Sequence, residues 1–263
     1  MSRLAILTEE EQREFDYPPI LSVEARALSF AIDDRLQKRI NKLHTPTNKV
    51  GFLLQYAYFK ACKRFFLINR FRQGDVEYAT KLLGIPLQKI KLHQYKERVP
   101  KCHEATILTI FDSHSFNSQK AWLEKEIKIR VERVLDPRTL FFELLHLLHQ
   151  HNVQVPSYNT LTELITEHYN SHEEFLLSII ESTLNEEHKK ALRALLQTTK
   201  NKSGSILNNY KYINQSGKIK ALQASITVFN EIQEIVGSSG IKGVCSNGRN
   251  PLCLAELCVA IAV

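Results

Sequence analysis

Apolar residues recur at intervals of three or four along most of this 263-residue chain, which is the spacing of one face of an α-helix. The polar positions between them carry frequent helix caps, such as Thr8 with Glu11 and Ser22. We therefore expect an all-α protein. The pattern predicts helices over residues 9–16, 22–30, 33–42, 46–62, 75–83, 87–99, 103–111, 121–135, 139–153, 160–170 and 221–236, with two more over 172–197.

The helix predicted at residues 46–62 is unusual because its apolar positions nearly encircle it. Thr45 is a suitable N-cap, and Pro46 stands at the first helical position, where a missing N–H costs nothing. One apolar stripe comprises Val50, Leu53, Leu54, Ala57 and Ala61, and a second comprises Phe52, Tyr56 and Phe59. A helix of this kind is typically buried. Basic residues flank it on both sides, including Lys38, Arg39 and Lys42 before it.

Two pairs of predicted helices have the order of a helix-turn-helix, whose second helix enters the major groove of DNA. In the first pair, a helix ending near Gly84 is followed by the basic helix 87–99. In the second, helix 139–153 is followed by a turn and a helix capped by Asn159 or Thr160. An ordinary helical hairpin explains the first pattern equally well, and an ordinary capped helix explains the second pattern better than DNA binding does.

The distribution of charge is more informative than the net charge of +7. Residues 1–34 hold 3 basic and 8 acidic side chains, whereas residues 35–101 hold 16 basic and 3 acidic. Residues 104–188 are acidic again, and residues 189–220 hold 8 basic and no acidic side chains. Such basic blocks are often only solvated surface, but two nearly acid-free blocks favour a polyanionic partner, most commonly nucleic acid.

Several classes of protein have no support in the sequence. The longest apolar run, LCLAELCVAIAV, is too short for a membrane span and contains a glutamate. The five cysteines are odd in number and lack paired spacing, which suits a reducing cytoplasm and argues against zinc. His146, His149 and His151 cannot share one helical face. No nucleophile motif or phosphate-binding loop occurs, so we expect no catalytic residue, no metal site and no cofactor.

Two ordered motifs resemble the N-terminal region of the Tn-three family of replicative transposases. They are LTEEEQREFDYPPILS and TPTNKVGFLLQYAYFKACKRFF, followed in the family's order by DVEYATKLLGI and VPSYNTLTELI. The likeness covers residues 4–235. It implies two helical DNA-binding domains that grip the terminal inverted repeats of a transposon. In that family a magnesium-dependent RNase-H-like domain, several hundred residues further on, cuts the DNA, and no catalytic acid can be assigned to this chain.

We accordingly expect an all-α protein with two helical DNA-binding domains containing helix-turn-helix-like units, at residues 1–115 and 116–236. Residues 237–263 would be a divergent tail, disordered or produced by a frameshift. The expected partners are double-stranded DNA and a full-length transposase, with no membrane and no small-molecule substrate, in a bacterial cytoplasm. The candidate DNA-binding residues are Lys49, Lys60, Lys63, Arg64, Arg70, Arg72, Lys89, Lys91, Gln94, Lys96, Arg98, Lys101, Ser157, Asn159, Thr160, Thr162, Lys200 and Lys202.

Within that set, Gln94 and Arg98 have the side-chain chemistry best suited to reading adenine and guanine. Three other hypotheses remain open. The chain could be a subunit that acts only with a separate catalytic polypeptide, a helical module that binds an acidic protein, or a transposase remnant without a role.

Overall fold

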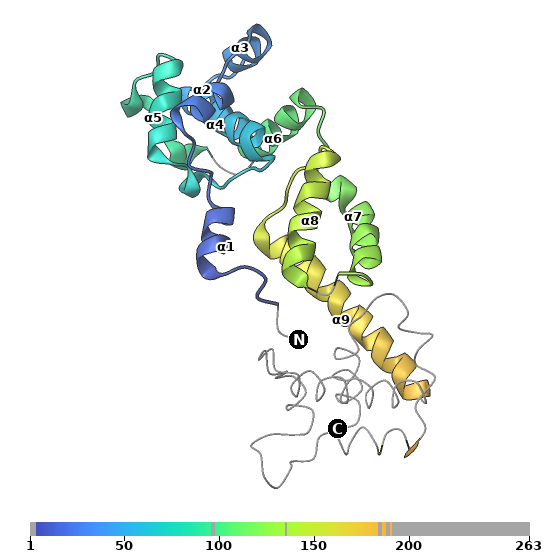
Figure 1. The fold of residues 1–263 in the computed structure, drawn as a ribbon. Coiled ribbons are helices and arrows are strands. Elements are labelled where there is room, and N and C mark those ends of the chain that lie inside the picture. The colour runs from blue at the N-terminus through green and yellow to red at the C-terminus, as the bar shows by residue number, and fades with distance from the viewer. Residues whose placement is uncertain (1–3, 96–97, 135, 184–185, 188–189, 191–263) are drawn as a thin grey trace, which may run out of the picture. The chain divides into compact units, whose positions relative to one another are not determined.

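The computed structural model describes residues 4–95, 98–134, 136–183, 186–187 and 190 (Figure 1). Several predicted features therefore lie outside the described residues. They are the helix at 221–236, the part of the predicted helices beyond residue 190, the basic block 189–220 apart from residue 190, and the tail 237–263. The chain divides into two compact units, Met1–Lys128 with Asp136–Thr166, and Ile129–Leu135 with Glu167–Val263. The proposed division of DNA binding between residues 1–115 and 116–236 stays a prediction.

The described residues are all-α, as the periodicity predicts, and contain no strand beyond one isolated bridge between His114 and Val153. None of these helices combines the length and the apolar content that crossing a bilayer requires. In chain order the elements are α1 (Glu9–Asp16), α2 (Val23–Ser29), α3 (Asp34–Asn41), α4 (Pro46–Cys62), the 3-10 helix η1 (Ile68–Arg70), α5 (Gln73–Leu82), the 3-10 helices η2 (Leu87–Lys89) and η3 (Leu92–Gln94), α6 (Arg98–Ile110), α7 (Phe116–Val131), α8 (Pro137–Gln150) and α9 (Tyr158–Thr183).

Helix α4 is the centre of the first unit, and its prediction from sequence is confirmed. Thr45 caps it by accepting a hydrogen bond from the Asn48 N–H, and Pro46 occupies its first turn. Every residue from Val50 to Phe59 is buried. The helices α2, α3, α5 and α6 all contact it. Since each fully buried Leu or Phe side chain contributes about 1.5–3 kcal/mol, this helix supplies much of the stability of the unit.

Polar groups inside this core are satisfied by specific partners. Asp75, which is fully buried, accepts a hydrogen bond from Arg26 Nε at 2.8 Å and another from the Tyr58 hydroxyl at 3.0 Å. The side chain of Gln55 donates to the carbonyl of Phe66 and accepts from its N–H. The first network joins α2, α4 and α5, and the second fixes the chain just after α4.

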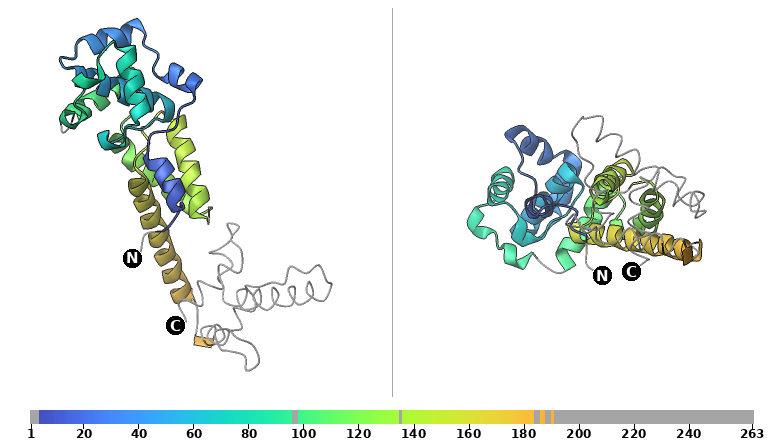
Figure 2. Two further views of the ribbon diagram at one scale, coloured as in Figure 1. Left: turned by 90° about the vertical axis from the view of Figure 1, so that its left-hand side faces the viewer. Right: turned by 60° about the horizontal axis from the view of Figure 1, so that its bottom comes forward.

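Helix α1 lies beside the start of α8, as Figure 2 shows. The capping box predicted for α1 is present, because Thr8 accepts from the Glu11 N–H and Glu11 accepts from the Thr8 N–H. The same Glu11 carboxylate accepts hydrogen bonds from both terminal nitrogens of Arg138, at 2.8 and 2.5 Å. These hydrogen bonds lower the pKa of Glu11 to about 2.

The α-helix predicted over residues 87–99 is wrong. Two short 3-10 helices, η2 and η3, occupy this segment, and α6 begins only at Arg98. Tertiary contacts explain the difference: the Lys91 N–H donates to the Thr47 hydroxyl at 3.0 Å, and the Tyr95 ring is fully buried. An α-helix would bond the Lys91 N–H within the segment itself. The first candidate helix-turn-helix therefore lacks its second helix.

The Tyr95 ring lies where a side chain on Gly51 would be. A Cβ built on Gly51 approaches the ring carbons of Tyr95 to 2.7 Å, far inside van der Waals contact. The absence of a side chain at this point of α4 allows the 87–95 segment to dock on the helix.

We expect the substitution Gly51→Ala to destabilise the protein by about 1–3 kcal/mol, because the added methyl overpacks against Tyr95. Urea unfolding followed by circular dichroism measures this. Gly74→Ala is the matched control: it is also helical, no atom lies within 4 Å of the point that an added Cβ would occupy, and alanine is the better helix former. Equal unfolding midpoints for the two variants would contradict the proposed contact.

Candidate nucleic-acid interface

The basic residues predicted to contact DNA fall into two groups, according to whether the structure gives them partners. Arg64, Arg70 and Arg72, which follow α4, point toward the end of α1 and the residues just after it. Residues 15–18, which are the last two residues of α1 and the next two, are called the N-terminal arm below. The three arginines bind carbonyl oxygens of Phe15, Asp16 and Pro18, respectively.

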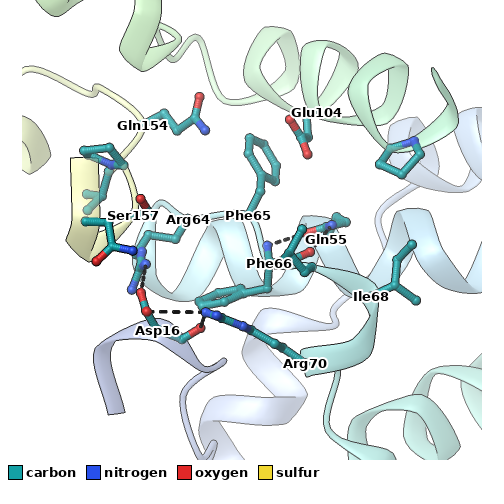
Figure 3. Close-up of a pocket in the computed structure, with 15 residues that line it drawn as sticks. Asp16, Gln55, Arg64, Phe65, Phe66, Ile68, Arg70, Glu104, Gln154 and Ser157 are labelled. Atoms are coloured by element: carbon teal, nitrogen blue, oxygen red, sulfur yellow. Dashed lines mark hydrogen bonds and ion pairs between the residues drawn. The ribbon is translucent and has the colours of Figure 1, made fainter. Parts of the chain in front are cut away.

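Asp16 is the acidic centre of this contact. Its carboxylate lies 3.6 Å from both Arg64 and Arg70, through separate oxygen atoms. Asp16, Arg64 and Arg70 line one wall of a cavity of about 390 Å³ (Figure 3). The Arg64 side chain is only 10% exposed, and its guanidinium lies 3.8 Å from the centre of the Phe15 ring. Arg64 is thus built into the fold, and burial lowers its pKa.

The two lysines at the end of α4 are also held by the protein. Lys60 donates to the Leu28 carbonyl at 2.7 Å. Lys63 donates to the Asn152 side chain at 2.7 Å and lies 5.3 and 5.2 Å from the ring centres of Phe59 and Phe111. Lys63 also adopts a left-handed backbone conformation, with φ of 56°, which ends the helix. These lysines therefore stabilise the packing around α4.

The second group lies at the surface, in the segment of residues 87–101. Its exposed members are Lys89, Lys91, Gln94, Arg98 and Lys101, and none makes an ion pair or side-chain hydrogen bond with another described residue. Lys49, half-buried in the first turns of α4, is equally without a partner in the described part of the chain. The segment and α4 meet at the bond from Lys91 to Thr47. The structure therefore brings Lys91 close to the start of α4, which carries Lys49. Arg98 and Lys101 lie in the first turn of α6, and no α-helix carries Lys89, Lys91 or Gln94.

Tyr95 and His103 anchor this segment to the core. The Tyr95 hydroxyl lies 2.7 Å from His103 Nδ1, and both side chains are buried. Burial raises the pKa of Tyr95 and lowers that of His103 to about 4. At neutral pH both groups are therefore uncharged, and they share one hydrogen bond whose donor depends on the imidazole tautomer.

The predicted contacts at the start of α9 are only partly at the surface. Ser157, rather than Asn159 or Thr160, caps this helix, since its hydroxyl accepts from the Thr160 N–H at 3.2 Å. Thr162 is fully buried and donates to the Tyr158 carbonyl. Ser157 and Asn159 are exposed. The helices α8 and α9 do follow one another across a short connection, but their use as a helix-turn-helix stays a prediction.

Lys96, Lys200 and Lys202 lie outside the described residues. Among the residues that the structure does describe, no group of three or more His, Cys, Asp or Glu side chains could hold a metal ion.

Comparison with protein families places the chain. Residues 6–168 match the model of a family described as a domain of unknown function, DUF4158. The match covers more than half of the chain, so the protein belongs to this family. A comparison with curated proteins found no match.

Sequence reasoning missed the role of the N-terminal arm in holding the arginines after α4. The acidic block of residues 1–34 beside the basic block of residues 35–101 was the available signal. Opposite charge on adjacent blocks is what internal pairing requires. The partners themselves had no signature, because most of them are backbone carbonyls.

We expect Asp16→Asn to lower the free energy of unfolding by about 3 kcal/mol, since it leaves the buried Arg64 without its carboxylate. Chemical denaturation measures this. The control is Glu9→Gln, which breaks an ion pair with Arg13 whose side chains are 90% and 76% exposed, and it should change stability by less than about 1 kcal/mol. A loss no larger than the control's would mean that Asp16 does not neutralise Arg64.

The anchor at His103 predicts a pH dependence. Because its folded pKa of about 4 lies below the ordinary value of 6.5, the unfolded chain binds a proton more readily than the folded one between these values. The stability that depends on unprotonated His103 is therefore fully present above pH 6.5, and about 2–3 kcal/mol of it is lost as the pH drops to 4. In His103→Gln this component should be absent. Unfolding curves of both proteins from pH 7.5 to 4 measure the difference, and parallel pH profiles would contradict it.

Proposed function

We propose that this chain binds double-stranded DNA sequence-specifically at the terminal inverted repeats of a transposon. In this proposal it is the N-terminal part of a transposase of the Tn-three type and has no strand-cleaving activity of its own. The observation that carries the proposal is the pair of ordered motifs, LTEEEQREFDYPPILS and TPTNKVGFLLQYAYFKACKRFF, which resemble that family's N-terminal region.

The surface chemistry is consistent with this proposal. The exposed cations of segment 87–101 make no ion pair or side-chain hydrogen bond with another described residue, so their charge is available to phosphates. Lysine and arginine side chains position a protein on the duplex in this way, and exposed Gln94 and Arg98 add groups that bind base edges. The arginines after α4 are left out of the interface, since the N-terminal arm occupies them.

A protein-interaction module with an acidic partner is the second candidate. The same unpaired cations favour it, because they would attract a carboxylate-rich surface as well as phosphates. The two functions differ in their dependence on base sequence, which only a DNA-reading protein shows.

The decisive experiment is fluorescence anisotropy with two labelled duplexes over a salt series. One duplex carries the terminal inverted repeat of a Tn-three type transposon from the source genome, and the other a shuffled copy. We expect a preference of about 10³-fold or more for the repeat. If ~6–10 phosphates are neutralised, the affinity should fall by about 10³–10⁵ between 50 and 200 mM salt.

Equal affinity for both duplexes together with weak salt dependence would contradict the proposal and favour the acidic protein partner. A strand-cleavage assay with magnesium on the same repeat should give no product from the chain alone. Cleavage by the purified chain would contradict the assignment as a binding protein.

A further inference from the structure

Helix α3 has three chemically distinct stripes along its two turns. Leu36 and Ile40 form the buried stripe, with 2% and 1% of their surfaces exposed. Gln37 and Asn41 form an amide stripe, and their side chains are joined by a hydrogen bond of 2.9 Å. The third stripe is basic and comprises Arg35, Lys38, Arg39 and Lys42, which follow the i, i+3, i+4, i+7 spacing of one helical face.

All four cations of the basic stripe are exposed, and none makes an ion pair or side-chain hydrogen bond with another described residue. The carboxylates beside them are Asp33 and Asp34. Asp33 is occupied as the N-cap, where it accepts from the Leu36 N–H at 2.7 Å. In contrast, the arginines after α4 and Arg26 are all bound to internal oxygen atoms. The protein thus pairs its inner cations and leaves those of α3 free.

The fold holds this stripe in a fixed position. The Asp33 cap and the burial of Leu36 and Ile40 fix both ends of α3 against the core, and α3 contacts α4 directly. Figure 1 shows α3 at the periphery of the first unit, on the far side of α2 from α1. A rigid, peripheral helix presents its charges without a large cost in side-chain and backbone ordering.

The composition of this face favours one kind of occupant. It carries no aromatic or aliphatic side chain, so it has nothing to insert into a lipid surface. The cores of protein interfaces are depleted of lysine and enriched in aromatic residues and arginine, whereas this face has two lysines and no aromatic residue. Cations with amides beside them suit duplex DNA instead, because cations neutralise phosphates and amides match base edges. A helix about 10–12 Å across also fits the major groove, which is about 12 Å wide.

We propose that α3 lies on duplex DNA, with the basic stripe Arg35, Lys38, Arg39 and Lys42 contacting its phosphates. This inference rests on the proposed function and assigns a part of the DNA interface to a helix outside the 87–101 segment.

The test compares two triple variants of the full chain in the anisotropy assay with the repeat duplex. The first is Arg35→Gln, Lys38→Gln, Arg39→Gln, which keeps good helix formers at all three positions. The matched control is Lys81→Gln, Lys125→Gln, Lys128→Gln, three exposed helical lysines that are also unpaired in the described part of the chain. Both variants remove the same charge, so an effect of net charge alone would be equal in the two.

We expect the α3 variant to bind about 10-fold or more weakly at 100 mM salt, and its salt slope to be smaller by about 2–3. The control should keep the wild-type slope. Thermal melting of both variants shows whether each is folded. If the wild type binds DNA and the α3 variant matches it in affinity and slope, the assignment of α3 is overturned while the proposed function stands. If the wild type shows no salt-dependent DNA binding, the proposed function fails.

A measurement on the unmodified protein decides the case even if the α3 variant does not fold. Lysine acetylation with and without the duplex, read by mass spectrometry, should show Lys38 and Lys42 protected by DNA and Lys125 and Lys128 still reactive. Equal reactivity of Lys38 and Lys42 with and without a saturating duplex would overturn the proposal.

Discussion

Burial of α4 on all sides is the constraint on which the first unit depends. A helix that is apolar most of the way round can be stable only when other elements cover each of its faces. The helices α2, α3, α5 and α6 do so, and the 87–95 segment closes the remaining side over Gly51. Because no face of its middle is left for water, the charged residues are displaced to its ends and to the helices around it.

This displacement explains why cations surround α4 and why they have two different uses. At its C-terminal end, Arg64, Arg70 and Arg72 meet the backbone carbonyls of residues 15–18, and Asp16 supplies the counter-charge. The two sequence motifs that carry the family resemblance are therefore physically joined, since one contains the arm and the other contains Arg64. Farther from this contact, on α3 and on segment 87–101, cations remain without partners among the described residues.

Local signals predicted most helix starts well, because caps and periodicity act within a few residues. The helices predicted separately at 160–170 and from residue 172 are instead one continuous helix, α9. Thr45 with Pro46 and Thr8 with Glu11 begin their helices as expected. The 87–99 segment could not be predicted, since its helical period was overridden by Thr47, more than forty residues away in sequence. Long-range packing also limited the prediction of the candidate site. Lys89 is exposed and Arg64 is buried, and this difference depends on tertiary contacts rather than on the local sequence. Nothing in the sequence around Arg64 indicates that a distant carbonyl holds it.

The hydrogen bonds between the three arginines and the N-terminal arm have a consequence for shortened forms of this protein. A chain that begins after residue 18 would retain Arg64, Arg70 and Arg72 but lose every oxygen atom that each now binds through its side chain. Three guanidinium groups would then face solvent together, in an arrangement suited to phosphates. Such a fragment would expose positive charge that the N-terminal arm neutralises or covers in the intact protein. Tighter DNA binding after removal of the N-terminus would thus be an artefact of exposure, rather than the release of a hidden natural site.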